Sequence, residues 1–180
     1  MVETAMDQPI TKPSDAEMPE YYRYYVGLVP ENDLLKGLKA TSTAWEKLLS
    51  EVSMEQFQGR YAEGKWTLAE VLMHLMDTER IFAYRAFRFS RKDEIVLPGF
   101  DENHYIQNLS VHPTKANPKQ WLKWHLNLRA GTLDLFESLT LEQMDFQGNA
   151  NGLKTTPRAL GFMIAGHDLH HLKVIQERYW

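Results

Sequence analysis

Four long segments of the chain carry apolar residues at the three- and four-residue spacing of one helix face, and this pattern constrains the fold most. The segments span residues 32–50, 68–90, 117–139 and 156–180. No convincing run of alternating apolar and polar residues competes with them, so a β-sheet has little support. We therefore expect an all-α protein whose four helices form an antiparallel, up-down-up-down four-helix bundle.

Three of these segments begin with recognisable start signals. Thr67 and Glu70 form a capping box before residues 68–90, in which two side chains satisfy free backbone N–H groups of the first turn. Pro118 and Pro157 stand at the first helical position of the third and fourth segments, where a missing N–H costs nothing. The sequence therefore predicts where these three helices begin.

Other stretches lie outside the helical pattern. Residues 1–30 are polar and proline-containing before they turn aromatic, and we expect an irregular N-terminal arm that docks on the bundle domain, residues 31–180. The connection 97–117, between the second and third helices, is too long for a simple turn, and we interpret it as a functional loop. Glycines and asparagines mark another loop between residues 148 and 152. The docking residues of the arm are Tyr21, Tyr22, Tyr24 and Tyr25.

Composition argues against several classes of function. The net charge of −4, from 24 acidic and 20 basic side chains, would repel a nucleic-acid backbone. The absence of cysteine excludes disulfides, thiolate metal sites and a cysteine nucleophile. No apolar run approaches the roughly 20 residues of a membrane span, and the first residues lack the apolar region of a secretory signal. We expect a cytoplasmic protein with no nucleic-acid and no membrane partner.

Three of the seven histidines face the expected interior of the bundle. His167 and His171 differ by about 40° around their helix, so their imidazoles stack one turn apart on an apolar stripe. His74 shares its face with Val71 and Ile81 and also points inward. The second and fourth helices of an up-down-up-down bundle run parallel, which lets the three imidazoles converge. Three histidines with one open position are typical of a catalytic metal site.

The same histidines also fit a plainer interpretation as packed core residues. A lone inward histidine is more often a satisfied core residue than a ligand. Two stacked imidazoles cannot both be charged in a core, however, and a shared cation is a natural solution. We expect the other histidines, His104, His112 and His125, to be loop or packing residues, with a pocket-lining role as the alternative for His125.

Two neighbours of the last-helix pair are candidates for a supporting role. The segment from His167 to His171 weakly resembles the HExxH pattern of metallopeptidases, with Asp168 in place of the glutamate. Asp168 could hold a ligand imidazole or act as a base for bound water, or it could be a solvated helix residue. His170 points to one side of the pair, and we interpret it as a flanking residue that supports a ligand.

Two arginines share the faces of the inward histidines, each eleven residues further along its helix. These are Arg85 and Arg178, and both should point into one end of the bundle. They could bind an anionic group of a substrate. Pairing with internal carboxylates such as Asp134 or Glu137 is the other explanation, and the sequence leaves their role open.

Five short motifs occur in a characteristic order along the chain. They are Gly64-Lys65-Trp66-Thr67, His74-Leu75-Met76-Asp77-Thr78-Glu79-Arg80, Pro98-Gly99-Phe100-Asp101-Glu102, Gly166-His167-Asp168-Leu169-His170-His171 and Glu177-Arg178-Tyr179. In order and spacing they resemble the DinB-like superfamily of damage-inducible, YfiT-related four-helix metalloproteins. The resemblance covers nearly the whole chain from Tyr21 onward.

This resemblance implies a four-helix bundle, commonly a homodimer, with one divalent transition metal ion such as zinc or nickel. His74 matches the ligand position of the family's second helix, and His167 and His171 match its last-helix pair. The family includes metal-dependent hydrolases and S-transferases that use low-molecular-weight thiols. The resemblance therefore implies a small-molecule substrate, and one class of substrate would be such a thiol.

We consequently hypothesise an enzyme, a hydrolase or a thiol S-transferase, whose metal ion activates water or a thiol. Because the chain has no cysteine, any thiol must come from outside the protein. The alternative is a non-enzymatic metal-binding or stress-response protein whose structural ion is strongly coupled to folding. A third and weaker hypothesis is a metal-free helical module that binds partners and uses the histidines for packing.

Overall fold

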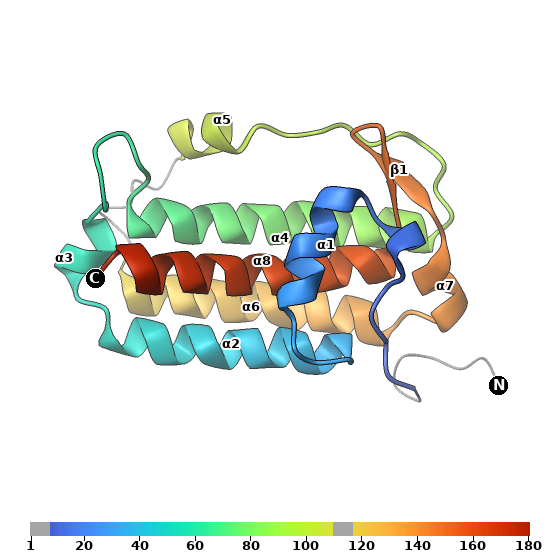
Figure 1. Ribbon diagram of the computed structural model, residues 1–180, viewed down its shortest axis with the longest axis horizontal. Coiled ribbons are helices and arrows are strands. Elements are labelled where there is room, and N and C mark those ends of the chain that lie inside the picture. The colour runs from blue at the N-terminus through green and yellow to red at the C-terminus, as the bar shows by residue number, and fades with distance from the viewer. Residues whose placement is uncertain (1–7, 110–116) are drawn as a thin grey trace.

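The computed structural model describes residues 8–109 and 117–180 and places four long helices side by side (Figure 1). They are α2 (Leu34–Glu51), α4 (Leu68–Ser90), α6 (Pro118–Glu137) and α8 (Pro157–Arg178). The expected all-α four-helix bundle is thereby confirmed. Shorter elements connect or flank these helices: η1 (Asp15–Glu17), α1 (Glu20–Leu28), α3 (Met54–Gln58), α5 (Glu102–Gln107), α7 (Leu141–Asp145), β1 (Gly148–Ala150) and β2 (Leu153–Thr155).

The predicted helix starts are confirmed by their capping contacts. The backbone N–H of Glu70 donates to Oγ1 of Thr67 at 3.2 Å, and the backbone N–H of Thr67 donates to the Glu70 carboxylate at 2.6 Å. Pro118 and Pro157 occupy the first turns of α6 and α8. The last helix ends at Arg178, slightly before the predicted end at residue 180.

The predicted up-down-up-down order is wrong, because α4 and α6 run in the same direction (Figure 1). Two ion pairs agree with this: Glu79 of α4 pairs with Arg129 of α6, and Lys92, just after α4, pairs with Glu142 of α7, just after α6, so that the partners of each pair are 50 residues apart. In parallel helices the numbers of paired residues differ by a constant amount, whereas in antiparallel helices the two numbers add up to a constant. It follows that α4 and α8 are antiparallel, and the order is up-down-down-up.

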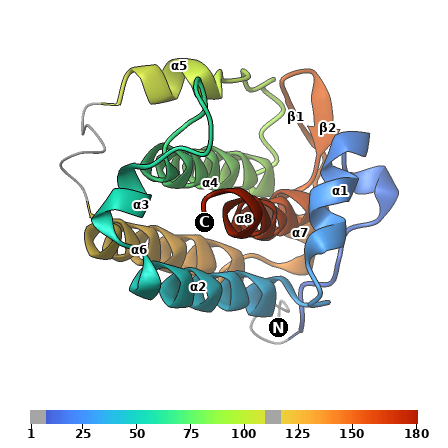
Figure 2. The same cartoon turned by 60° about the vertical axis from the view of Figure 1, so that its left-hand side comes forward.

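The long connection between α4 and α6 explains this topology. An extended chain advances about 3.3 Å per residue and a helix about 1.5 Å, so a connection of this length can return along the 23-residue α4. It runs outside α4, and α5 lies on this return path (Figures 1 and 2). The connection therefore covers one side of the bundle instead of only turning at its end.

A small β-hairpin holds the first part of this connection in place. The backbone N–H of Leu97 donates to the carbonyl of Asn149 at 3.0 Å, and the N–H of Asn151 donates to the carbonyl of Leu97 at 2.8 Å. Asn151 and Gly152 both have positive φ, as the two-residue turn of a twisted hairpin requires. The predicted loop at residues 148–152 is thus the turn region of β1 and β2.

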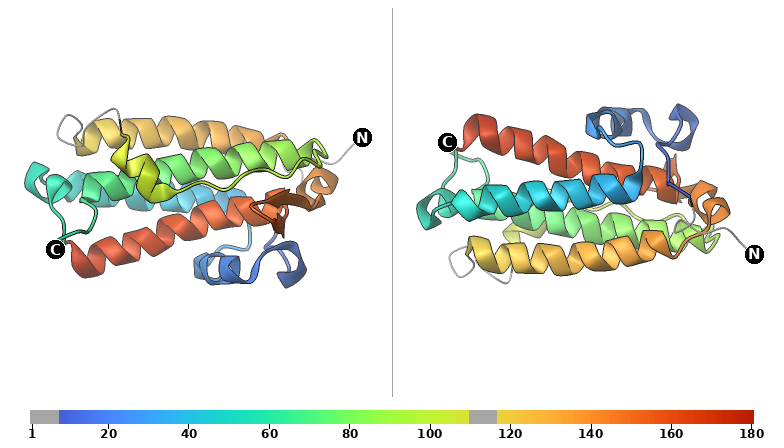
Figure 3. Two further views of the ribbon diagram at one scale, coloured as in Figure 1. Left: turned by 90° about the horizontal axis from the view of Figure 1, so that it is seen from above. Right: turned by 90° about the horizontal axis from the view of Figure 1, so that it is seen from below.

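The N-terminal arm also differs from the irregular segment that we expected. Residues Glu20–Leu28 form α1, which crosses α8 on the outside of the bundle (Figures 1 and 3). Of the predicted docking rings, Tyr22 is buried and Tyr25 is half-buried, whereas Tyr21 and Tyr24 are exposed. Two of the four predicted docking rings are thus at least partly buried.

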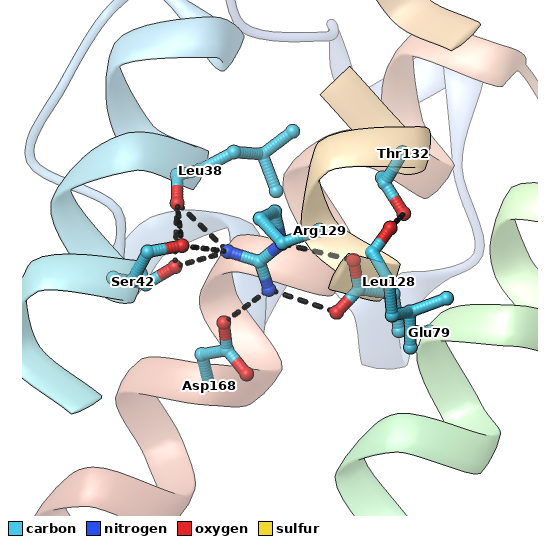
Figure 4. A network of polar contacts seen from close by, with 8 residues as sticks. Leu38, Ser42, Glu79, Leu128, Arg129, Thr132 and Asp168 are labelled. Atoms are coloured by element: carbon cyan, nitrogen blue, oxygen red, sulfur yellow. Dashed lines mark hydrogen bonds and ion pairs between the residues drawn. The ribbon is translucent and has the colours of Figure 1, made fainter. Parts of the chain in front are cut away.

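Inside the bundle, the guanidinium group of Arg129 joins all four long helices (Figure 4). It donates to both Glu79 carboxylate oxygens at 2.9 Å and to the Asp168 carboxylate at 2.6 Å. It also donates to the Leu38 carbonyl at 2.7 Å and to Thr41 Oγ1 at 2.8 Å. Because all of these groups are buried, the network fixes the level at which the helices meet.

Among the described residues, no helix is both long enough and apolar enough to cross a membrane. The apolar residues instead form an interior between the four helices. One part of this core centres on Trp45 and Trp121, whose ring centroids lie 5.7 Å apart.

We predict that Arg129→Met lowers the free energy of unfolding by about 3–5 kcal/mol, because it leaves two buried carboxylates without a countercharge. Urea denaturation would measure the change. The matched control is Lys39→Met, which breaks the surface pair between Lys39 and Glu137 and should cost about 1 kcal/mol or less. Equal losses in the two variants would contradict the role assigned to Arg129.

Candidate metal centre

The three predicted histidines meet between α4 and α8. His74 comes from the start of α4, and His167 and His171 come from the middle and the C-terminal half of α8. The antiparallel register of the two helices is fixed next to them by Tyr179, whose hydroxyl donates to the Trp66 carbonyl at 2.8 Å. The imidazoles converge because the end of α8 lies beside the start of α4.

The distances between these imidazoles match those of ligands around a single ion. Nε2 of His167 lies 3.2 Å from Nε2 of His74 and 3.1 Å from Nε2 of His171. One ligand atom from each of the three residues lies within 4.8 Å of the others. Tetrahedral zinc with metal–nitrogen bonds of about 2.0–2.1 Å separates its nitrogen ligands by about 3.3 Å. The donor set therefore fits one divalent transition metal ion.

Burial keeps the three imidazoles neutral. It lowers the pKa of His74 to about 4, against an opposing effect of the Glu102 carboxylate. Burial also lowers the pKa values of His167 and His171 well below the ordinary value, and the neighbouring imidazoles add to this effect. Since neutral imidazole is the form that binds metals, all three side chains are available as ligands near pH 7.

The imidazoles line a cavity of about 460 Å³, a volume suited to a small molecule. Its walls are partly aromatic: the Trp66 ring centroid lies 5.1 Å from that of His74, and the Tyr25 centroid lies 5.8 Å from that of His167. Other rings come from α1, α4 and the long connection, namely Tyr22, Phe82 and Phe100. The imidazoles are therefore bordered by aromatic rings on several sides.

Asp168 lies next to His167 in the sequence, but its carboxylate faces the interior of the bundle. It is 3% exposed and accepts a hydrogen bond from Arg129, and it does not line the cavity. Burial acts to raise its pKa, but Arg129 and His125 together lower it below the ordinary value. The alternative of a solvated helix residue is wrong, and support of an adjacent imidazole stays a prediction.

His170 lies at the edge of the cavity rather than among the three converging nitrogens. Its Nδ1 is 3.3 Å from the Tyr24 hydroxyl, and its ring centroid is 5.4 Å from that of Tyr25. Burial lowers its pKa, and Lys173 adds to the effect. The predicted flanking position agrees with this placement, and its supporting role stays a prediction.

The other histidines lie away from the centre where they are described. His104 is exposed on α5, and His112 falls outside the described residues. His125 is 1% exposed and stacks on Trp121, with ring centroids 4.9 Å apart and planes at 10°. It is a packing residue and does not line the cavity beside the imidazoles.

The two arginines do not share one end of the bundle, because the antiparallel helices carry them in opposite directions. Arg85 lines the cavity, whereas Arg178 lies with its guanidinium carbon 5.5 Å from the Tyr61 ring centroid. Neither makes an ion pair within residues 8–109 and 117–180, and Glu137 pairs with Lys39 instead. The proposed pairing with internal carboxylates is thus not what the structure has.

Sequence reasoning missed several residues around the imidazoles. Trp66 was assigned to no site, Tyr25 only to docking, and Phe100 and Glu102 only to the long connection. The available signal was the family resemblance, since Trp66, Phe100 and Glu102 belong to the motifs that carry it.

Comparisons with known proteins agree with the fold. The family model described as the DinB superfamily matches residues 38–175. A similar solved structure is YfiT from Bacillus subtilis, described as a probable metal-dependent hydrolase with an unusual four-helix bundle topology. It is 20% identical, the match covers 92% of this chain and 91% of YfiT, and the TM-score is 0.63. No curated protein matches the chain.

We predict that Gly166→Ala destabilises the protein by about 1–3 kcal/mol, because a Cβ at this position would lie 2.0 Å from the Tyr25 carbonyl oxygen. The close approach of α1 to α8, beside His167, depends on this glycine. The control is Gly131→Ala on the exposed face of α6, where a Cβ meets nothing within 4 Å and alanine should stabilise the helix slightly. Urea denaturation that finds both variants equally stable would contradict this packing.

We also predict that His125→Phe reduces the loss of stability in acid. Neither ring nitrogen of His125 has a hydrogen-bond partner among the described residues, and burial lowers its pKa. A group with a lowered folded-state pKa stabilises the protein above its unfolded pKa of about 6.5, and this contribution is lost as the pH falls.

The free energy of unfolding at pH 7.5 and pH 5.0 would test this prediction. The variant should lose less stability than the wild type between the two values, by at most about 2 kcal/mol for one titrating group. An equal or larger loss in the variant would show that His125 does not titrate in this way.

Proposed function

This chain belongs to the DinB superfamily, and from this membership and its three-histidine cluster we propose that it is a metal-dependent enzyme. In this proposal His74, His167 and His171 hold one divalent transition metal ion, zinc or nickel. The reaction is hydrolysis or transfer of a low-molecular-weight thiol, and the substrate is a small molecule. The observation that carries the proposal is the convergence of three neutral Nε2 atoms on one cavity wall.

The chain's own residues supply most of the conditions for such a reaction. The three imidazoles leave at least one coordination position free, and their cavity is large enough for a small substrate. A bound zinc or nickel ion would supply a positive charge that lowers the pKa of water or of a thiol toward neutrality. Aromatic rings on several sides of the cavity provide apolar surface against which the carbon skeleton of a small substrate can pack.

Glu102 is the carboxylate best placed to accept the proton that the nucleophile releases. It begins α5, lines the cavity and acts on the pKa of His74. Asp168, the base suggested by the HExxH pattern, is instead engaged by Arg129. We therefore propose Glu102 for proton transfer, and Asp168 as a residue that helps to position α8 and its imidazoles.

The test is elemental analysis of untagged protein purified without added metal. We expect about one equivalent of a transition metal in the wild type, and loss of most of it in His74→Ala and in His171→Ala. His104→Ala is the matched control, because this exposed imidazole lies on α5 away from the cluster, and it should retain the metal. Absence of metal, together with failure to bind added zinc or nickel, would refute the proposal.

A second measurement separates catalysis from a purely structural ion. If the ion is catalytic, chelation should abolish activity on a panel of esters, amides and electrophilic thiol acceptors while the bundle stays folded, as judged by circular dichroism. Activity that requires an added thiol would identify an S-transferase. Unfolding on chelation without any turnover would favour the non-enzymatic alternative.

The family resemblance also supports two further proposals. We propose a homodimer, which light scattering after size-exclusion chromatography would test, and a cytoplasmic location, which cell fractionation would test. The metal site does not require the dimer, because all three proposed ligands come from one chain.

A further inference from the structure

Arg85 is a buried cation without a carboxylate partner among the described residues. Its side chain lies on α4, where the residue is 5% exposed. One guanidinium nitrogen donates to the Pro98 carbonyl at 2.8 Å, and the guanidinium carbon lies 5.6 Å and 5.7 Å from the ring centroids of Phe82 and Phe100. A carbonyl and two aromatic rings stabilise a guanidinium group, but they do not neutralise its charge.

Arg129, the second buried arginine among the described residues, shows how the charge of a buried guanidinium group can be fully neutralised. Arg129 donates to two carboxylates, from Glu79 and Asp168, and to a carbonyl. These partners hold its pKa above the ordinary value even though burial acts to lower it. Arg85 has the Pro98 carbonyl and a contact with the Tyr22 hydroxyl, and both partners are neutral, so its environment lacks one negative charge.

Arg85 opens into the same cavity as the three imidazoles. It follows His74 by three turns on one face of α4, which separates their Cα atoms by about 16 Å. Both side chains lean toward the start of α4, but the arginine side chain is the longer one, so the gap from its guanidinium group to the imidazoles is shorter than this Cα separation, on the order of 10 Å. A single extended small molecule can bridge that distance.

The cavity wall between the imidazoles and Arg85 is formed by a buried threonine and two aromatic rings. Thr78 stands one turn after His74, is 4% exposed and lines the cavity, and its hydroxyl has no hydrogen-bond partner among the described residues. The rings of Phe82 and Tyr22 follow, with centroids 5.9 Å apart. The Thr78 hydroxyl oxygen itself is closed off from the cavity, so Thr78 forms part of the wall through its other atoms.

We propose that Arg85 binds the carboxylate of a substrate whose reacting bond lies at the three histidines, with an apolar spacer between the two groups. The planar guanidinium group suits a carboxylate, which can accept two parallel hydrogen bonds from it. A phosphate dianion would lack a second cation, because Arg85 is the basic side chain that lines this cavity within the described part of the chain.

This inference rests on the proposed function, because it takes the three histidines as the reacting end of the site. It adds a substrate class, an organic carboxylate, and a residue that determines specificity. It also assigns a use to the covering segment, since Pro98 and Phe100 of the long connection hold the guanidinium group in place.

The test compares two probes of the same shape, 4-phenylbutyrate and its uncharged amide, by isothermal titration calorimetry. Both are titrated into metal-free protein and into zinc-loaded protein. We expect the wild type to prefer the carboxylate by about tenfold or more in both forms, as for hydrogen bonds to a charged group. Arg85→Gln should abolish this preference and leave the metal content unchanged.

Two further variants keep the test decisive. Arg88→Gln is the matched control, because Arg88 lies one turn further on α4 and pairs with Asp93 outside the cavity, and its preference should equal that of the wild type. Arg85→Lys keeps the charge where the glutamine variant fails to fold, and it should reduce the preference severalfold because the planar donor pair is lost.

Other results would overturn the inference. If the carboxylate binds only to zinc-loaded protein and Arg85→Gln does not weaken it, the carboxylate binds the metal instead of Arg85. If neither form prefers the carboxylate, Arg85 only anchors the connection through Pro98. Both results are independent of whether the protein turns over a substrate, and carboxylate binding to the metal-free form would survive a failure of the metal proposal.

Discussion

The burial of Arg129 between two carboxylates determines how the four long helices meet. A guanidinium group leaves water only when partners surround it, so α2, α4 and α8 have to present Leu38, Glu79 and Asp168 at one level of the bundle. Asp168 directly follows one proposed ligand in α8, and Glu79 stands five residues after His74 in α4. The register that satisfies Arg129 is therefore also the register in which the imidazoles converge.

The two buried arginines show how the same residue type serves stability in one place and an open site in another. Arg129 has its full set of partners and lies 1% exposed, so it has no donor left for a ligand. Arg85 is almost equally buried but faces the cavity with neutral partners alone among the described residues: one carbonyl, the Tyr22 hydroxyl and two rings. A position needed only for packing would be at least as stable with an apolar side chain. Retaining an uncompensated charge there is explained when a ligand supplies the counterion.

The sequence was sufficient to predict the long helices, their capped starts and the inward faces of the three histidines, because each depends on local spacing. The starts at Thr67, Pro118 and Pro157 follow from backbone groups within one turn. The hairpin could also have been found, since Asn-Gly between two short runs is a hairpin signal, but we interpreted those residues as a loop. The helical form of α1 was hidden by its exposed tyrosines, because it packs on α8 through one narrow face.

Helix direction was beyond the sequence, because periodicity shows which face is buried and not which way the helix runs. For the imidazoles the error is moderate: a parallel α8 that starts beside α4 would place His167 and His171 about one and two turns beyond the level of His74. It mattered more toward the helix ends, where a parallel arrangement would bring Arg85 and Arg178 together. In the antiparallel pair the two arginines separate, and Arg85 alone remains in the cavity with the histidines. The return of the long connection, which reverses α6 and covers α4, is thus also what gives Arg85 its isolated position.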